Sequence, residues 1–171
     1  HEAHGTGTPL GDPIEAGSLA AAVLKARQES GSLISSSIKA NLGHAEPAAG
    51  MVGMLKVVVS LELAHAAPNA QLRVMNPHVK EKSGVGPGTG ACAFPAQLAE
   101  LPWRQSGRKG VREAASASTV AGGVSSFGLG GTIAQAVLRH YASLSSDTTA
   151  LQAVSYQRRC FLWLDLPHPF T

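Results

Sequence analysis

Two histidines stand in loops that are rich in small and polar residues. His4 opens the segment HGTGT at residues 4–8, and His44 closes the segment KANLGH at residues 39–44. Glycines let the backbone come close to a ligand, and an imidazole can donate or accept protons near neutral pH. Together, two such loops predict acid/base or hydrogen-bonding chemistry in one shared pocket. Taken singly, a histidine beside glycines is more often a structural residue.

The second loop gives this prediction more weight. Lys39 and His44 lie five residues apart, between a predicted strand and a predicted helix. His44 therefore falls near the N-terminus of that helix, where the helix dipole favours a neutral imidazole. In the first loop, Thr6 and Thr8 offer hydroxyl groups beside His4. A third loop, SSFGLGGT at residues 125–132, adds a glycine-rich turn near the C-terminus.

Two predicted helices must position these loops. The first covers residues 13–29: Asp12 can cap it, Pro13 suits its first position, and Glu15 can reach back as the capping-box partner. Gly31 follows as a stop signal, and residues 33–38 are expected to form a strand. The second helix covers residues 47–64 and is apolar nearly all round, which is typical of a helix buried inside a domain.

The remaining chain predicts a hairpin and several irregular segments. Residues 120–127 and 132–138 are expected to be strands joined by the turn at residues 128–131. Residues 68–90, which contain three prolines and a run of alternating glycines, are expected to be irregular, and residues 143–149 to be a polar linker. The order of elements predicts an α/β fold with helices layered around a sheet.

Composition excludes several classes of protein. Of 171 residues, 44% are hydrophobic and 15% charged, which argues for a packed core. The net charge of +3 is too small to predict nucleic-acid binding, and no apolar run approaches the ~20 residues of a membrane span. Cys92 and Cys160 form neither a disulfide framework nor a zinc motif, so we expect no metal and a reducing, cytoplasmic compartment.

Three motifs resemble one family. Residues 4–15 (HGTGTPLGDPIE) resemble the first histidine motif of the β-ketoacyl synthase (ketosynthase) domains of type I modular polyketide synthases. Residues 38–50 (IKANLGHAEPAAG) resemble their second histidine motif, and residues 125–132 their C-terminal glycine-rich loop. The resemblance spans residues 1–140. Residues 141–171 are expected to be a linker or tail after the domain, and residues 156–169 look like the basic, aromatic linker of modular synthases.

The resemblance implies a fold and a reaction. The fold is the thiolase-like layered α-β-α-β-α arrangement, of which this chain would form only the C-terminal half. The reaction is an acyl transfer, a decarboxylative Claisen condensation of an acyl thioester with a malonyl-type extender. The substrates would ride on the phosphopantetheine arm of an acyl carrier protein, with no cofactor bound directly. The parent protein would be a homodimer, and its N-terminal half would complete the domain.

The resemblance also assigns roles to single residues. His4 and His44 would assist the loss of CO2 and stabilise the enolate, while Lys39 would balance charge and orient the second loop. Thr6 and Thr8 would contact the phosphopantetheine arm. Phe127 and Leu129 would shape the acyl entrance, and the Leu129 N–H would be one donor of the oxyanion hole.

The nucleophilic cysteine of the family has no counterpart in this chain, because it lies upstream of the first histidine motif. Cys92 has small neighbours but follows both histidines, and no predicted helix follows it to lower its pKa, so we interpret it as inert. Cys160 lies beyond the matched region. We therefore expect the chain to be a fragment that is inactive alone, and poorly soluble or molten when expressed alone.

Two alternatives remain open. Ile133 and Gln135 stand where the family usually has asparagine and histidine, which leaves room for a non-elongating, scaffold-like domain that binds carrier protein without turnover. A histidine-based metal hydrolase would rest only on His4, His44 and Asp12, whose spacing matches no known metal motif.

Overall fold

The first three residues join two parts of the sheet. The computed structural model describes residues 1–27, 32–84, 92–101 and 119–141. Glu2 makes parallel bridges to Ser36 on one side and to Val124 on the other. Its N–H donates to the Gly123 carbonyl at 2.7 Å, and its own carbonyl accepts from the Ser125 N–H at 3.0 Å. Because both edges of this segment are paired, it has the position of an interior strand, although it is too short to be a named strand.

Within the described residues, six strands form three pairs. Strand β1 (Leu33–Ile34) runs parallel to β3 (Cys92–Ala93), and β2 (His65–Ala66) runs antiparallel to β4 (Ala99–Glu100). Strands β5 (Thr119–Phe127) and β6 (Ile133–Tyr141) form an antiparallel hairpin in continuous register, from Thr119 opposite Tyr141 to Phe127 opposite Ile133. The predicted hairpin is confirmed. Strands β2, β3 and β4 were not predicted, because two-residue strands carry no alternating pattern.

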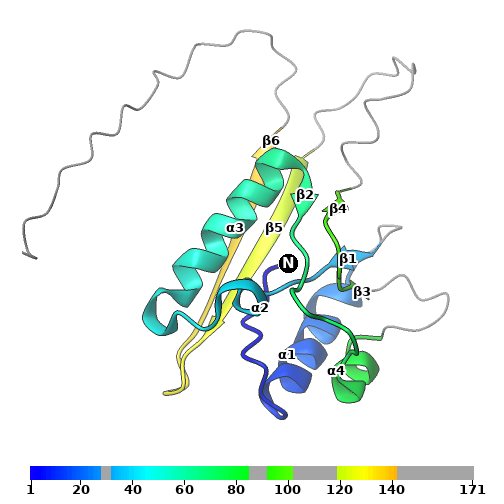
Figure 1. The fold of residues 1–171 in the computed structure, drawn as a ribbon, viewed down its shortest axis with the longest axis vertical. Coiled ribbons are helices and arrows are strands. Elements are labelled where there is room, and N and C mark those ends of the chain that lie inside the picture. Colours follow the sequence, from blue (N-terminus) through cyan, green and yellow to red (C-terminus); the bar gives the residue numbers. More distant parts are fainter. Residues whose placement is uncertain (28–31, 85–91, 102–118, 142–171) are drawn as a thin grey trace, which may run out of the picture.

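Helix α3 (Ala49–Leu63) lies along the hairpin, as Figure 1 shows. A short 3₁₀ turn over Glu46–Ala48 precedes it and contains Pro47. Residues of α3 at intervals of four are buried, namely Ala49, Gly53, Val57 and Leu61. Val57 and Leu61 pack with Val124 of β5 to form the core cluster, against which Met54, Val120 and Leu138 pack. The predicted helix is thus confirmed to within two residues.

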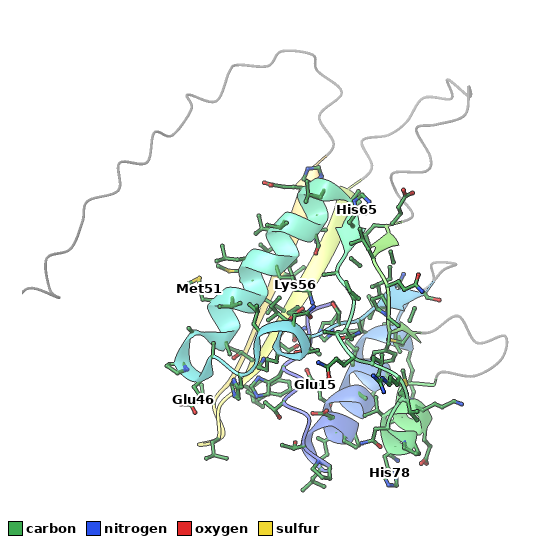
Figure 2. All side chains as sticks on the ribbon, in the orientation of Figure 1. Glu15, Glu46, Met51, Lys56, His65 and His78 are labelled. Carbon is green, nitrogen blue, oxygen red and sulfur yellow. The ribbon has the colours of Figure 1, made fainter. Side chains whose placement is uncertain are left out.

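The opposite side of α3 is exposed within the described part of the chain. Met51, Leu55, Val59 and Leu63 are each more than half exposed. Figure 2 shows Met51 pointing away from the sheet, whereas Lys56 points toward it. Helix α3 is apolar nearly all round, but among the described residues only one of its faces is buried.

Helices α1 (Gly11–Leu19) and α4 (Pro77–Lys82) pack together at the other end of the molecule (Figure 1). A π-helical turn over Ala20–Leu24 continues α1, so the predicted helix is confirmed except near its two ends. It begins at Gly11, with Leu10 at the N-cap position, so the expectation that Asp12 caps it is wrong. The prediction that residues 68–90 are irregular is wrong for α4, whose start the Asn76 side chain caps by accepting from the His78 N–H.

Some predicted features fall outside the described residues. These are Gly31, the alternating glycines at 85–90, the linker at 143–149 and the tail at 156–169. None of the helices in the described ranges is both long enough and apolar enough to cross a membrane.

The α3–β5 contact predicts the outcome of one substitution. A Cβ at Gly122 would stand 2.5 Å from Val57 Cγ1, so Gly122→Ala must push α3 away from the hairpin. In the complete domain, of which this chain is expected to form a part, we expect Gly122→Ala to lower the free energy of unfolding by about 1–3 kcal/mol. Gly123→Ala is the matched control, because its Cβ would meet nothing closer than 3.6 Å. Equal midpoints of the two variants in urea unfolding would contradict the close packing.

Candidate active site

The structure brings His4, His44 and Phe127 together from three separate segments. The ring centroids of His4 and His44 lie 5.8 Å apart with their planes at 87°. The Phe127 ring lies 5.4 Å from His4, at 50°. His4 is thus held between a second imidazole and an aromatic ring at the end of β5, and the two loops share one site.

A buried carboxylate fixes the first loop. Glu15, in α1, accepts hydrogen bonds from the His4 N–H at 2.7 Å and from the Gly5 N–H at 2.9 Å. Gly5 has φ +45°, and a Cβ there would lie 2.9 Å from Ser37 Cβ, so the loop needs glycine at this position. The expectation that Glu15 completes a capping box is wrong: its two oxygens are occupied by the loop, and Asp12 accepts from the Gly7 N–H instead.

The second loop contains one helical turn that the sequence did not predict. Lys39 begins α2 (Lys39–Leu42), and Gly43 ends it with φ +82°. His44 follows, and its Nδ1 accepts a hydrogen bond from the Glu46 N–H at 3.1 Å. A neutral imidazole whose Nδ1 accepts carries its proton on Nε2, so Nε2 is a hydrogen-bond donor. Glu46 itself has φ +44°, an unfavourable conformation for a residue with a Cβ.

Burial and charge keep His4 neutral. Burial is the largest cause that lowers the pKa of His4, and the positive charge of Lys39 lowers it further, as does His44 whenever it is protonated; the charge of Asp12 opposes them. Burial also lowers the pKa of Lys39, which the carboxylates of Glu2 and Glu15 partly offset. Within the described residues, His4 Nδ1 is buried and has no hydrogen-bond partner.

Burial raises the pKa of Glu15, while the Gly5 and His4 N–H groups oppose that rise. The carboxylate that anchors the first loop therefore sits in a partly desolvated position. Its negative charge is kept there by two hydrogen-bond donors of the backbone.

A cavity of about 840 Å³ lies against both loops. Thr6, Lys39 and His44 line one side of it, and the segment from Asn69 to Asn76 lines another. Asn69 holds this segment in place, because its side-chain oxygen accepts from the Ser37 N–H at 2.9 Å and its amide donates to the Pro95 carbonyl at 3.3 Å. The cavity is large enough for a small organic ligand.

Two predicted site residues lie apart from this group. The Thr8 hydroxyl accepts from the Gly11 N–H at 3.1 Å and thus supports the start of α1. Leu129 lies at the tip of the hairpin with a fully exposed side chain. Ile133 and Gln135, which depart from the family pattern, are exposed on β6.

Cys92 is placed in the core of the sheet. It pairs with Leu33 across β1 and β3, and only 5% of its surface is exposed. Burial raises the pKa of its thiol, which favours the unreactive protonated form. Residues 92–93 form β3, a strand that the sequence did not predict. Cys160 lies outside the described residues.

Across the described ranges, no group of three or more His, Cys, Asp or Glu side chains is arranged to hold a metal ion. Asp12 acts on the first loop through its bond to the Gly7 N–H.

Comparison with known proteins identifies the family. A family model described as the C-terminal domain of β-ketoacyl synthase matches residues 1–73. The polyketide synthase–nonribosomal peptide synthetase TwmB of Talaromyces wortmannii is 37% identical over 153 residues, which are 90% of this chain and 5% of that protein. Erythronolide synthase EryA3 of Saccharopolyspora erythraea is 39% identical over 139 residues, which are 80% of this chain and 4% of that protein.

Solved ketosynthases agree with the sequence comparison. The oxazolomycin ketosynthase domain of Streptomyces albus superposes with a TM-score of 0.66 at 29% identity, over 84% of this chain and 23% of that one. The chain belongs to the ketosynthase domains of modular polyketide synthases. Ketosynthase twelve of the bacillaene polyketide synthase of Bacillus amyloliquefaciens gives a TM-score of 0.63 at 33% identity, over 82% of this chain and 22% of that one.

The predicted fold is therefore confirmed: this ketosynthase chain is the C-terminal part of a thiolase-like domain. It spans about a twentieth of the first curated relatives and less than a quarter of the ketosynthases that it superposes on. The roles of its site residues and the boundary after residue 140 stay predictions.

The electrostatics of His4 can be checked by NMR titration. Lys39→Met removes a positive charge that lowers the pKa of His4, so the His4 titration should move to higher pH. Its pKa should still remain below that of an ordinary histidine, because burial is the larger cause. Lys25→Met, at an exposed lysine beyond the end of α1, is the control and should leave His4 unchanged. An unmoved His4 in Lys39→Met would contradict this account.

The burial of Cys92 gives a second test. Cys92→Ala should leave covalent acyl loading of the full-length synthase unchanged, because a buried thiol with a raised pKa is a poor nucleophile. The measurement is mass spectrometry of the acylated protein. Loss of acylation with an unchanged unfolding midpoint would make Cys92 the nucleophile and overturn its assignment as inert.

Proposed function

We propose that this chain provides the two-histidine side of a condensing site in a polyketide synthase. The observation that carries the proposal is the meeting of His4 and His44 beside Phe127, next to a cavity that Lys39 lines. The reaction is the decarboxylative condensation of an acyl thioester with a malonyl-type extender. The nucleophilic cysteine comes from a part of the synthase outside these 171 residues.

The proposed chemistry uses the histidines as hydrogen-bond donors. The carboxylate of the extender leaves as CO2, and the electrons of the broken bond form an enolate whose oxygen carries negative charge. The His44 Nε2–H, whose tautomer the Glu46 N–H favours, donates to that oxygen, and His4 acts beside it in its neutral form. The enolate carbon then attacks the acyl thioester carbonyl, forms the new carbon–carbon bond and releases the cysteine thiolate.

The other residues bind and orient in this proposal. Lys39 lines the cavity and provides a positive charge there. Thr6 lines the same cavity, where it would contact a phosphopantetheine arm. Thr8 can donate its hydroxyl proton to the same arm while it accepts from the Gly11 N–H. Phe127 limits the acyl entrance next to His4, and Leu129 extends it at the hairpin tip, where its N–H would serve as an oxyanion-hole donor.

The proposed partners are an acyl carrier protein and the N-terminal half of the same domain. The exposed apolar side of α3, with Met51, Leu55 and Val59, supports a covering half-domain, because such a stripe is seldom left in water. The synthase is proposed to act as a homodimer.

One observation favours a second function. Ile133 and Gln135 replace polar residues that the family usually carries after the glycine loop, and Ile133 presents an exposed apolar side chain there. A domain that loads an acyl chain and binds carrier protein without extending the chain would tolerate this change. Extension of the chain by the unsubstituted synthase decides against this alternative.

The proposed function is tested in the full-length synthase. His44→Ala and His4→Ala should each slow CO2 release from the carrier-bound extender by about 100-fold or more, because each removes a donor to the enolate oxygen. Acyl loading of the nucleophilic cysteine should be nearly unchanged. The two steps are followed separately, by CO2 release and by mass spectrometry of the acyl-enzyme.

His78→Ala is the matched control, because His78 is exposed on α4 and far from the two loops in sequence. It should retain both steps. Undiminished CO2 release by His44→Ala would refute the proposed role of the second histidine loop.

A further inference from the structure

A buried ion pair lies beneath the site and is not used by the chemistry proposed above. Lys56 Nζ lies 2.7 Å from Glu2 Oε2, and the two side chains are only 9% and 2% exposed. Lys56 Nζ also donates to Ser36 Oγ at 2.7 Å. Removing two charges from water costs free energy, and an apolar pair of similar volume often stabilises a fold equally well or better. Stability alone is therefore a weak reason for this ion pair.

The second oxygen of Glu2 reaches the second histidine loop. Glu2 Oε1 accepts from the Ile38 N–H at 2.6 Å, and Ile38 is the residue immediately before α2. No side chain of α2 caps its own start. One carboxylate therefore pairs with α3 through Lys56 and holds the N-terminal end of α2, the turn that carries Lys39 and leads to His44.

The surroundings fit the pair closely. A Cβ at Gly53, one turn before Lys56 on α3, would lie 3.0 Å from Glu2 Cγ and 3.2 Å from a methyl group of Val124. The Glu2 side chain thus fills the space between α3 and β5 that this glycine leaves. Its backbone is fixed on both sides by Gly123, Ser125 and Ser36.

The groups that face Lys39 include both members of the pair. Glu2 and Glu15 favour the charged form of Lys39, and Lys56 opposes it. The carboxylates of Glu2 and Glu15 and the ammonium groups of Lys39 and Lys56 therefore give two negative and two positive charges near the loops. Removing one member leaves an uncompensated buried charge next to Lys39.

We propose that Glu2 and Lys56 are a positioning pair for condensation: the ion pair fixes the carboxylate that caps α2, and so sets the place of Lys39 and His44 opposite His4. The proposal rests on the proposed function. Neither residue touches substrate in it. Lys56 acts through Glu2, and Glu2 acts through the Ile38 N–H.

The test compares Lys56→Met, Glu2→Gln and the double variant in the full-length synthase. Each single variant leaves one buried charge unpaired, so both the unfolding midpoint and kcat should fall. The double variant replaces the ion pair by neutral side chains of similar shape, so its unfolding midpoint should return toward that of the unsubstituted protein. Its kcat should stay at least about tenfold low with KM nearly unchanged, because the oxygen that accepts from the Ile38 N–H is no longer fixed by an ion pair with Lys56.

Amide hydrogen exchange gives a readout that does not depend on activity. Exchange at residues 38–44 should be about tenfold faster or more in Lys56→Met and in the double variant, with little change in the second half of α3. Lys82→Met, which removes an exposed pair with Glu81 at 4.0 Å on α4, is the control and should alter neither kcat nor exchange.

If kcat and exchange recover together with the unfolding midpoint in the double variant, the pair is merely structural and the proposal is overturned. If the unsubstituted synthase shows no decarboxylation, the proposed function fails. The exchange at residues 38–44 then still decides whether the pair positions α2.

Discussion

The Glu2 carboxylate accepts a hydrogen bond from the Ile38 N–H and pairs with Lys56, while the Glu2 backbone bridges Ser36 and Val124. Three segments that are far apart in the sequence, residues 36–38, α3 and β5, therefore meet at Glu2. A buried carboxylate is tolerated only when its oxygens are occupied, and here both are. The place of the second histidine loop relative to the first follows from this arrangement, because Glu2 lies two residues before His4.

The environments of the two histidines differ. His4 is partly buried between His44 and Phe127 and lies near Lys39, so the charged imidazolium is disfavoured. His44 is exposed, and its tautomer is set by the Glu46 N–H, which a backbone conformation with φ +44° directs at Nδ1. In the first loop, the Glu15 carboxylate accepts from the His4 and Gly5 N–H groups and so fixes the backbone rather than the imidazole. Both loops are thus positioned through backbone N–H groups, and Nε2 of His44 is left for a substrate.

The sequence predicted the long elements and the site loops, because these have strong local signals. The long apolar run of α3 and the glycine-rich turn between β5 and β6 are clear within a single window. The hydrogen bonds of Glu15 could not be predicted, since a capping box was an equally good local use of its carboxylate. The Glu2–Lys56 pair was missed for a similar reason. A single lysine in an apolar helix is the only local sign of it, and its partner lies 54 residues away. Strands β3 and β4 depend wholly on partners distant in sequence.

Contacts between α3 and β5 are made at nearly backbone distance. Gly50 lies against Ser126, Gly53 against Val124, and Gly122 against Val57. Such interlocked surfaces cannot slide without overlapping, since protein interiors are close-packed. Helix α3, which follows His44, and strand β5, which ends at Phe127, are therefore expected to move as one rigid unit. A displacement of the hairpin tip by a bound acyl chain would be transmitted along them to the far end of α3, and the rings of His44 and Phe127 would move together with that of His4.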